Sequence, residues 1–263
     1  MKSNDNSIDV SIIIVSWNVK ELLLESIKSI KQHTNDINYE IIVIDNNSSD
    51  DSVNAIKNEY PDIRLIENKQ NKGFGVANNQ GVKVARGKYL VFLNPDTKLL
   101  YNIIPKLINN KENSGAFLIG PEQINHKNKV GSNSGRTHPF VLFSTFIENS
   151  LLKNKPPEKR IFLKGLFKMK VLIGAFWLIK KSDFIDLGMF DETIFMYTEE
   201  IYICNKINKK GGIILLDRNE YYYHYHGAST KQAPTETAFH YSYTLKNYFI
   251  KSLNNIFNKT VNE

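Results

Sequence analysis

The sequence predicts an α/β fold in which a mostly parallel central sheet is flanked by helices. First, β-branched apolar runs alternate with segments whose apolar residues recur at helical spacing. Second, the connecting segments are short, as in right-handed β-α-β units with parallel strands. Third, 263 residues, 41% of them hydrophobic, are enough for a buried core but not for many domains.

The first strand and the first helix follow one another directly. Val10–Val15 is a mainly β-branched run, typical of a strand buried on both faces. We expect Asn18 to cap the next helix, with Glu21 three residues later as in a capping box. The apolar residues that recur at helical spacing on this helix are Leu23, Ile27 and Ile30.

The same alternation continues to residue 93. Further buried strands are expected at Glu40–Ile44, Ile63–Ile66 and Tyr89–Leu93. The polar turn Asn46–Asp50 leads into a short helix that Pro61 ends, and Asn71–Val84 is expected to be a glycine-containing turn followed by a helix.

The second half of the chain is less regular. Gln123–Lys170 is rich in Asn, Lys, Gly and Pro and is expected to be a long functional loop region. The elements expected around it are, in order, a helix over Leu99–Asn110, a strand over Ala116–Ile119, a strand over Val171–Ile179, a short helix from Ser182 or Asp183 to Gly188, a helix capped by Thr198, a strand over Ile213–Leu216 and a helix over Glu236–Phe257.

Composition restricts the partners and the location. A net charge of +7 favours anionic partners such as phosphorylated substrates, nucleic acid or acidic membranes. The positive residues are dispersed and form no recognised nucleic-acid module, so we expect no nucleic-acid partner. Cys204 is the single cysteine, which excludes an internal disulfide. The polar N-terminus, and the lack of an apolar stretch of ~20 residues, predict a cytoplasmic protein whose membrane contacts are peripheral.

Polar clusters follow three of the expected strands, at Ser16–Asn18, Asp45–Asn47 and Asn94–Asp96. Because ligands of parallel sheets bind at the carboxyl ends of the strands, this coincidence predicts the position of a site. Asp96 would suit a divalent cation that also contacts substrate phosphates. The alternative is that Pro95 and Asp96 only form a turn before a helix.

Three further motifs have both a functional and a structural interpretation. The glycines of Asn71–Asn79 would let the backbone approach a phosphate at a helix N-terminus, although a glycine-rich turn alone is weak evidence. Glu199 and Glu200 lie in the expected first turn of a helix, where acidic residues are ordinary partners of the helix dipole. His224 and His226 would share one face of a strand and could bind a metal, or they are surface histidines.

Seven segments in chain order form a set that is more specific than any one of them: Val10–Asn18, Ile41–Ser49, Asn71–Asn79, Phe92–Asp96, Ile173–Ala175, Gly188–Glu192 and His224–Ser229. This set resembles the inverting, family 2 nucleotide-sugar glycosyltransferases with the GT-A fold. Within that family, the nearest pattern is that of the bacterial rhamnosyltransferase-like group.

The resemblance implies a Rossmann-like GT-A domain over residues 1–230 and a C-terminal helical tail over residues 231–263. The nucleotide-binding half would cover about 8–120, and an irregular acceptor-side half about 121–230. The implied activity moves a sugar, rhamnose in the nearest group, from a dTDP- or UDP-sugar to a hydroxyl of a growing cell-surface glycan or lipid-linked acceptor. The implied cofactor is Mn²⁺ or Mg²⁺.

The resemblance also assigns roles to residues at matching positions, with Asp45 bonded to the pyrimidine. The nucleotide-binding residues would be Ser16, Asn18, Asp45, Lys72, Asn78 and Asn94. Asp96 and His224 would bind the metal, and Glu200 would be the general base. The acceptor side would include Glu199, Gly174 and Ala175.

The acidic motif departs from the family pattern. The family's Glu-Asp-x-Asp-Leu becomes Glu199-Glu200-Ile201-Tyr202-Ile203, so the base would be a glutamate and the second aspartate is a tyrosine. Asn94 replaces the first aspartate of the family's Asp-x-Asp. The change at Asn94 is common in the nearest group, whereas the altered acidic motif leaves a catalytically silent nucleotide-sugar-binding protein as the alternative function.

The expected tail helix interleaves aromatic residues with lysines. Basic amphipathic helices bind anionic interfaces, so this pattern predicts an anionic membrane surface as a partner. The alternative is that the helix packs its aromatic residues on the catalytic domain or on a second subunit, as in a homodimer.

Overall fold

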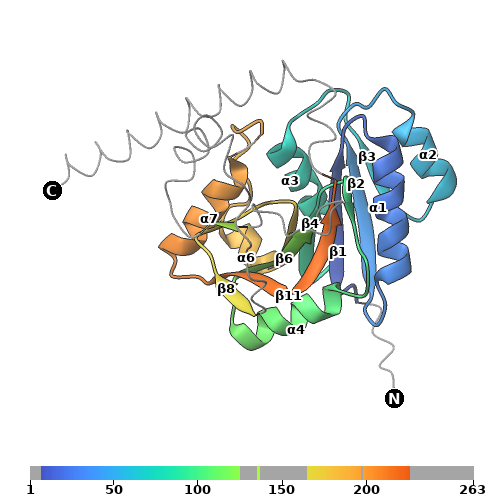
Figure 1. The fold of residues 1–263 in the computed structure, drawn as a ribbon. Helices are drawn as coiled ribbons and strands as arrows, with labels where there is room; N and C mark the ends of the chain where they lie inside the picture. The colour runs from blue at the N-terminus through green and yellow to red at the C-terminus, as the bar shows by residue number, and fades with distance from the viewer. Residues whose placement is uncertain (1–6, 125–134, 137–164, 197, 226–263) are drawn as a thin grey trace, which may run out of the picture.

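In the computed structural model, a central β-sheet lies between helices on both of its faces (Figure 1). The structure describes residues 7–124, 135–136, 165–196 and 198–225. The expected tail at 231–263, His226 and most of the expected loop region lie outside the described residues.

The elements of the described ranges alternate between strand and helix up to β4. The strands are β1 (Val10–Ser16), β2 (Tyr39–Asp45), β3 (Arg64–Glu67), β4 (Tyr89–Leu93), β5 (Thr97–Lys98), β6 (Leu118–Ile124), β7 (Gly135–Arg136), β8 (Leu166–Lys168), β9 (Val171–Leu172), β10 (Phe176–Lys180) and β11 (Ile214–His224). The helices are α1 (Lys20–His33), α2 (Ser52–Glu59), α3 (Phe74–Val84), α4 (Ile104–Ser114), α6 (Lys181–Asp186) and α7 (Glu199–Lys209). None of the helices in these ranges has the length and the apolar surface needed to cross a bilayer.

The strands of the central sheet lie in the order β3-β2-β1-β4-β10-β6-β11-β5, and β8 also pairs with β11. β3, β2, β1 and β4 are parallel, as short β-α-β units require. β10 runs antiparallel to both β4 and β6, and β11 returns parallel to β6. The predicted α/β class with a mostly parallel sheet is therefore confirmed.

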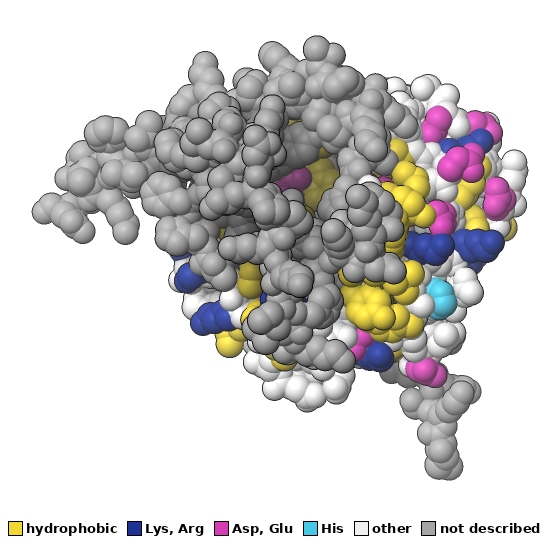
Figure 2. All heavy atoms as spheres, in the orientation of Figure 1, with side chains coloured by type: hydrophobic (Ala, Val, Ile, Leu, Met, Phe, Trp, Pro, Cys, Tyr) yellow, Lys and Arg dark blue, Asp and Glu magenta, His cyan; other side chains and the backbone are white. Residues whose placement is uncertain are grey.

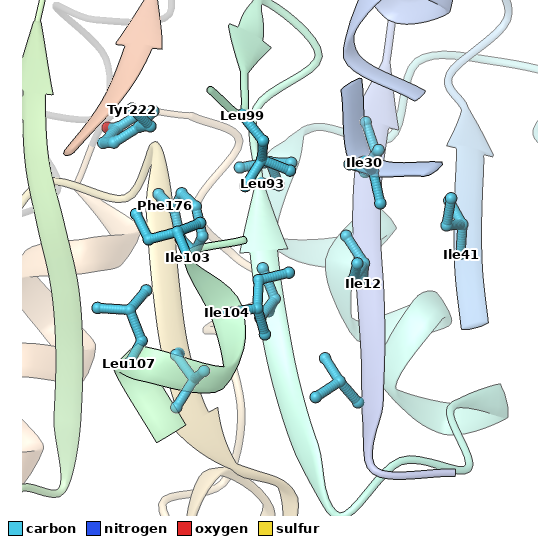
Figure 3. Close-up of a cluster of buried hydrophobic side chains, with 14 of the residues drawn as sticks. Ile12, Ile30, Ile41, Leu93, Leu99, Ile103, Ile104, Leu107, Phe176 and Tyr222 are labelled. Carbon is cyan, nitrogen blue, oxygen red and sulfur yellow. The ribbon is translucent and has the colours of Figure 1, made fainter. Parts of the chain in front are cut away.

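Apolar side chains on the two faces of the sheet form two buried layers. On β1, Ile12 and Ile14 belong to the layer under α1 and α4, while Ile13 belongs to the layer under α3, α6 and α7. Figure 3 shows the first layer, in which side chains from the sheet meet Ile104 and Leu107 of α4. Each fully buried aliphatic side chain contributes roughly 1.5–3 kcal/mol, so these two layers hold the strand ends in fixed positions.

The prediction of a single strand over Val171–Ile179 is wrong. The structure has two strands, β9 and β10, separated by Ile173–Ala175, where the chain turns toward the start of α7. The periodicity did not reveal this break, because apolar residues lie on both sides of it. The break positions Gly174 and Ala175 in the site described below.

Other boundaries also differ from the prediction. α4 begins at Ile104 rather than at Leu99, whose buried side chain joins the core from a loop. β11 continues past Leu216 to His224, across an irregularity between Asp217 and Tyr221 where polar residues hide the strand pattern. β6 runs to residue 124, so Gln123 lies in a strand and not in the expected loop region.

The prediction that Asn18 caps α1 is also wrong. The helix begins one residue later, and the N–H of Lys20 donates to Asp50 Oδ2 at 2.7 Å. Asn18 instead has a positive φ of 52°, which aims its side chain at a neighbouring loop. Thr198 does occupy the N-cap position of α7, but its side chain makes no capping hydrogen bond.

Candidate active site

The carboxyl ends of β1 and β2 bring two buried polar side chains side by side. Ser16 is in register with Asp45, and the two residues are 0% and 2% exposed. Asp45 Oδ2 accepts a hydrogen bond from the N–H of Ser48 at 2.9 Å. Among the described residues, neither Asp45 Oδ1 nor Ser16 Oγ has a hydrogen-bond partner. Because an unpaired buried acceptor is costly, this pair is suited to bind the N–H or O–H of a ligand.

Asn18 holds together the loops that follow these two strands. Its Oδ1 accepts a hydrogen bond from the N–H of Ser49 at 2.7 Å. Its own N–H donates to the hydroxyl oxygen of Ser48 at 2.9 Å. Asn18 therefore lies beside the Ser16–Asp45 pair and links the loops after β1 and β2 by hydrogen bonds.

The glycine-containing segment at the start of α3 packs against a distant part of the chain. The N–H of Phe74 donates to the carbonyl of Phe195 at 2.9 Å, and the N–H of Gly73 donates to Asn71 Oδ1 at 3.0 Å. Gly73 has a φ of +81°, and a Cβ there would lie 2.4 Å from the Phe195 carbonyl oxygen. The lack of a side chain at Gly73 therefore lets the backbone of Phe195 approach closely. The two N–H groups that could have bound a phosphate donate to protein oxygens instead.

Lys72 and Asn78 flank this contact. Lys72 is half-buried in the loop that precedes α3. Asn78 is buried within α3, and its Nδ2 donates to the carbonyl of Phe74 at 3.0 Å. The structure therefore gives the Asn78 side chain a bond within its own helix, to another residue of the segment in which the nucleotide was expected.

Asp96 and His224 meet at the end of the sheet although 128 positions separate them in sequence. β5 pairs with β11 so that Thr97 lies opposite His224, and the N–H of Tyr225 donates to the carbonyl of Asp96 at 3.0 Å. His224 Nε2 then lies 3.2 Å from Asp96 Oδ1, with the two side chains 7% and 9% exposed. The predicted metal ligands are thus brought into direct contact.

This pair has the chemistry and the spacing of two neighbouring cation ligands. Octahedral Mg²⁺ sites have ligand distances of about 2.1 Å, which places adjacent ligand atoms about 3 Å apart. No cluster of three or more His, Cys, Asp or Glu side chains in the described part of the chain is arranged to hold a metal. Such ions commonly complete their coordination with water and substrate phosphates, so a site with two protein ligands suits a cation shared with a substrate.

The break between β9 and β10 connects the region of Asp96 with the start of α7. The N–H of Asn94 donates to the carbonyl of Ala175 at 3.0 Å. A Cβ at Gly174 would lie 3.8 Å from the Cβ of Glu200, in ordinary contact. Asn94, Ala175, Gly174 and Glu200 therefore form one continuous row.

Glu199 and Glu200 are the first two residues of α7. Glu199 is buried, whereas Glu200 keeps part of its surface exposed although protein atoms surround its carboxyl group. Burial raises the pKa of Glu200 well above its ordinary value, and the charge of Glu199 adds to this shift. A carboxylate with a raised pKa is a better acceptor of protons near neutral pH.

Two residues to which the sequence analysis assigned no role support the site. Asn79 pairs with the backbone of Phe190 in both directions, donating to its carbonyl at 3.0 Å and accepting from its N–H at 3.1 Å. Gln123 Oε1 lies 3.0 Å from Nδ1 of His224. Asn79 belonged to a recognised motif, but no local pattern distinguished Gln123 from the start of a loop.

Three acidic groups along this edge have different surroundings. Asp45 has a buried oxygen without a partner, Asp96 faces an imidazole, and Glu200 has a raised pKa. Together these side chains can bind a polar ligand group, hold a cation and accept a proton.

Residues 11–188, roughly two thirds of the chain, match the sequence model of the family described as Glycosyl transferase family 2. Similar proteins include an uncharacterised glycosyltransferase of Bacillus subtilis strain 168, YfnE, which is 27% identical over 73% of this chain and 58% of its own length. The hexosyltransferase Agl10 of low-salt glycan biosynthesis in Haloferax volcanii is 25% identical over 96% of this chain and 78% of its own. The rhamnosyltransferase WbbL of Escherichia coli K12 is 27% identical over 77% of this chain and 78% of its own.

The fold is similar to that of GalNAc-T7 in a crystal structure with UDP, GalNAc and Mn²⁺. The TM-score is 0.64 at 19% sequence identity, over 85% of this chain and 45% of the GalNAc-T7 chain. The predicted GT-A fold is confirmed. The chain spans 58% of YfnE and less than half of this structural neighbour, so the likeness covers only part of either protein.

Proposed function

Since the chain belongs to glycosyl transferase family 2, we propose that it is an inverting, metal-dependent glycosyltransferase. It moves a sugar from a nucleotide-diphosphate donor to a hydroxyl of a cell-surface glycan or lipid-linked acceptor. The observation that carries this proposal is the row of Asp45, Asp96 and Glu200, which gives one edge of the sheet a ligand-binding group, a cation-binding group and a proton acceptor.

The donor side is built on the strand ends. Asp45 Oδ1 and Ser16 Oγ, both buried and unpartnered among the described residues, bind the polar edge of the nucleobase. Asp96 and His224 hold the divalent cation beside the diphosphate. When bound, this cation neutralises the charge that grows on the leaving group. Asn94 lies beside the same diphosphate, fixed by its bond to Ala175.

The acceptor side begins at α7. The Glu200 carboxylate takes the proton of the acceptor hydroxyl as the oxygen attacks the anomeric carbon. The bond from that carbon to the diphosphate oxygen breaks on the opposite face, which inverts the configuration without a covalent enzyme intermediate. Glu199, Gly174 and Ala175 surround the acceptor hydroxyl and keep Glu200 in place.

The finer identity of the donor is proposed from the relatives. WbbL is a rhamnosyltransferase, and the GalNAc-T7 structure contains UDP and Mn²⁺. We therefore propose a dTDP- or UDP-sugar as the donor, with dTDP-rhamnose and UDP-hexoses the first to test, and Mn²⁺ or Mg²⁺ as the cofactor. On the part of the surface that Figure 2 shows in colour, acidic and basic side chains are interspersed over α1 and α2, a pattern that does not favour a nucleic-acid partner.

A thermal-shift screen of nucleotide sugars with and without Mn²⁺ tests the donor site. A ligand that binds the folded state raises the melting temperature by mass action, so the donor should stabilise the protein more when Mn²⁺ is present. Asp96→Ala should lose this Mn²⁺-dependent gain and keep the melting temperature of the free protein within a few degrees. Glu67→Ala, at the end of β3 on the far edge of the sheet, is the matched control and should respond like the parent.

Sugar release from a labelled donor separates an enzyme from a silent nucleotide-sugar-binding protein. The enzyme releases sugar faster when the acceptor is present, whereas a silent protein shows the thermal shift without release. If Asp96→Ala binds donor and Mn²⁺ as the parent does, the cation does not lie at Asp96 and the proposed site is wrong.

A further inference from the structure

The buried side-chain amide of Gln123 contacts the ring of His224 at Nδ1, the nitrogen that does not face Asp96. β6 and β11 pair in parallel, with Gln123 opposite Tyr222, so Gln123 and His224 project from the same face of the sheet. Gln123 is 0% exposed, and its Oε1 lies 3.0 Å from His224 Nδ1. The imidazole also stacks on the ring of Tyr222, with centroids 6.1 Å apart and planes 26° apart. The ring of His224 is therefore fixed both in position and in rotation.

The contact between Gln123 Oε1 and His224 Nδ1 bears on which ring nitrogen carries the hydrogen. The Oε1 of a carboxamide can only accept a hydrogen bond, so the Nδ1 that faces it must carry a hydrogen. In a neutral imidazole with that hydrogen, Nε2 carries the lone pair of the ring and lies 3.2 Å from Asp96 Oδ1. Two acceptors at that distance repel each other unless a positive charge lies between them.

We propose that Gln123 is a positioning residue for the cation site. Its amide oxygen selects the Nδ1–H tautomer of His224 and thereby presents the Nε2 lone pair beside the Asp96 carboxylate. This inference rests on the proposed metal-dependent function and adds to it a residue that nothing in the sequence motifs identified. Outer partners of this kind orient a ligating histidine and increase its basicity.

The backbone supports the same arrangement from the other side. Asp96 is held by the bond from the N–H of Tyr225 to its carbonyl, and the neighbouring Thr97 pairs with His224 across β5 and β11. The aspartate and the histidine are therefore each fixed by a separate partner. Gln123 is the one that acts on the imidazole nitrogen remote from Asp96.

Two substitutions at Gln123 separate the hydrogen bond from packing. Gln123→Met keeps a similar length but removes the acceptor. Gln123→Glu, with its carboxyl group ionised, keeps an oxygen that can only accept and therefore preserves the Nδ1–H of His224. In ¹⁵N spectra of the metal-free full chain, His224, assigned by comparison with His224→Gln, should show Nδ1 protonated in the parent and in Gln123→Glu. Gln123→Met should show a mixture of the two tautomers.

Mn²⁺ affinity, measured by electron paramagnetic resonance with and without UDP, gives the second readout. Gln123→Met should bind Mn²⁺ about 10–100-fold more weakly, as is typical when the outer partner of a metal ligand is lost. Gln123→Glu should bind within a few fold of the parent, and this rescue excludes a purely structural effect. Gln123→Met should keep the circular dichroism spectrum of the parent, which would show that it folds. If this variant does not fold, the tautomer of the parent and the Mn²⁺ affinity of Gln123→Glu still test the proposal.

Two results would overturn the proposal. One is a parent spectrum with the hydrogen on Nε2 of His224, which would mean that the amide donates to Nδ1 instead of accepting. The other is a folded Gln123→Met variant with unchanged Mn²⁺ affinity. Asp96→Ala distinguishes this failure from that of the proposed function: if it also binds Mn²⁺ normally, the cation site itself is elsewhere.

Discussion

Successive residues of a helix point about 100° apart, so Glu199 and Glu200 face different surroundings at the start of α7. Glu199 is 5% exposed, whereas Glu200 lies against Gly174 in the break between β9 and β10. Burial, together with the charge of the neighbouring Glu199, raises the pKa of Glu200. Of the two, Glu200 is therefore the one prepared to receive a proton.

Glu200→Gln should remove catalysis while leaving donor binding nearly unchanged. Glutamine keeps the size and the hydrogen-bonding capacity of the side chain but cannot take up the proton. Turnover should fall by the ~10²–10⁴ typical of general-base loss, as measured by initial rates of sugar transfer at saturating donor. Glu199→Gln is the matched control and should have a smaller effect. Near-parental transfer by Glu200→Gln would place the base elsewhere, and a larger loss at Glu199 would shift the assignment by one residue.

Because the pKa of Glu200 is raised, both turnover and the melting temperature of Glu200→Gln relative to the parent should depend on pH. Below this pKa the folded protein holds a proton on Glu200 and the base is inactive, so turnover should rise as pH increases through it. The unfolded chain loses this proton near the ordinary value of 4.5, so the group lowers folding stability as pH rises above that value. Glu200→Gln should therefore melt at the parental temperature near pH 4 and increasingly above it toward neutral pH. A difference in melting temperature that does not depend on pH would contradict the shift.

At the scale of elements, α3 is joined to the segment that leads into α7. The N–H of Phe74 bonds to Phe195, and Asn79 bonds to Phe190 in both directions. Phe190 also packs against the ring of Phe74, with centroids 5.9 Å apart. The donor-side helix therefore supports the chain segment that precedes the proposed base.

Gly73→Ala should break this contact. A Cβ there would lie 2.4 Å from the Phe195 carbonyl oxygen, and the positive φ of +81° is itself unfavourable for alanine. Gly115, at the end of α4, also has a positive φ of +65° but has no atom within 4 Å of a built Cβ. Gly115→Ala should therefore cost about 1 kcal/mol of unfolding free energy from φ alone, and Gly73→Ala about 3 kcal/mol or more. Urea denaturation measures both, and equal losses would show that the contact with Phe195 contributes nothing.

Elements with a clear period and a clear end could be predicted from the sequence. β1 and β2 are continuous apolar runs that stop at polar residues, and their predicted ends, Val15 and Ile44, lie one residue before the observed ends at Ser16 and Asp45. The break at Ile173–Ala175 could not be predicted, because it depends on contacts with α7 rather than on the local pattern. The length of β11 was also hidden, since its polar middle is stabilised by pairing with β6.

The site likewise contains residues that could be predicted from the sequence and residues that could not. Asp96 and His224 were identifiable because they belong to motifs, and the pairing of β5 with β11 brings them together. Gln123 was not identifiable, because its role depends on a register between strands that are about ninety residues apart in sequence. Asn18 occupied a motif position, but its role in bridging two loops depends on the position of Ser49.

At the scale of the whole molecule, the tail lies outside the described residues, and its role rests on the sequence alone. Phe239, Tyr243, Tyr248 and Phe249 are interleaved with lysines in a chain of net charge +7. Aromatic and basic residues on one helix favour the interface of an anionic bilayer. An enzyme whose acceptor is linked to a lipid would gain from being held at that surface.

We therefore predict that the full chain sediments with vesicles of phosphatidylcholine and phosphatidylglycerol but not with phosphatidylcholine alone. Each lysine near an anionic surface contributes roughly 1 kcal/mol, so Lys246→Glu with Lys251→Glu should weaken binding at least about tenfold. Lys209→Glu with Lys210→Glu, at the C-terminal end of α7, changes the net charge by the same amount at another place and should bind like the parent. Equal losses in the two double variants would mean that the overall charge attracts the membrane rather than the tail. A parent that stays in solution, and whose tail variant changes its elution from dimer to monomer, would show that the tail packs on a second subunit instead.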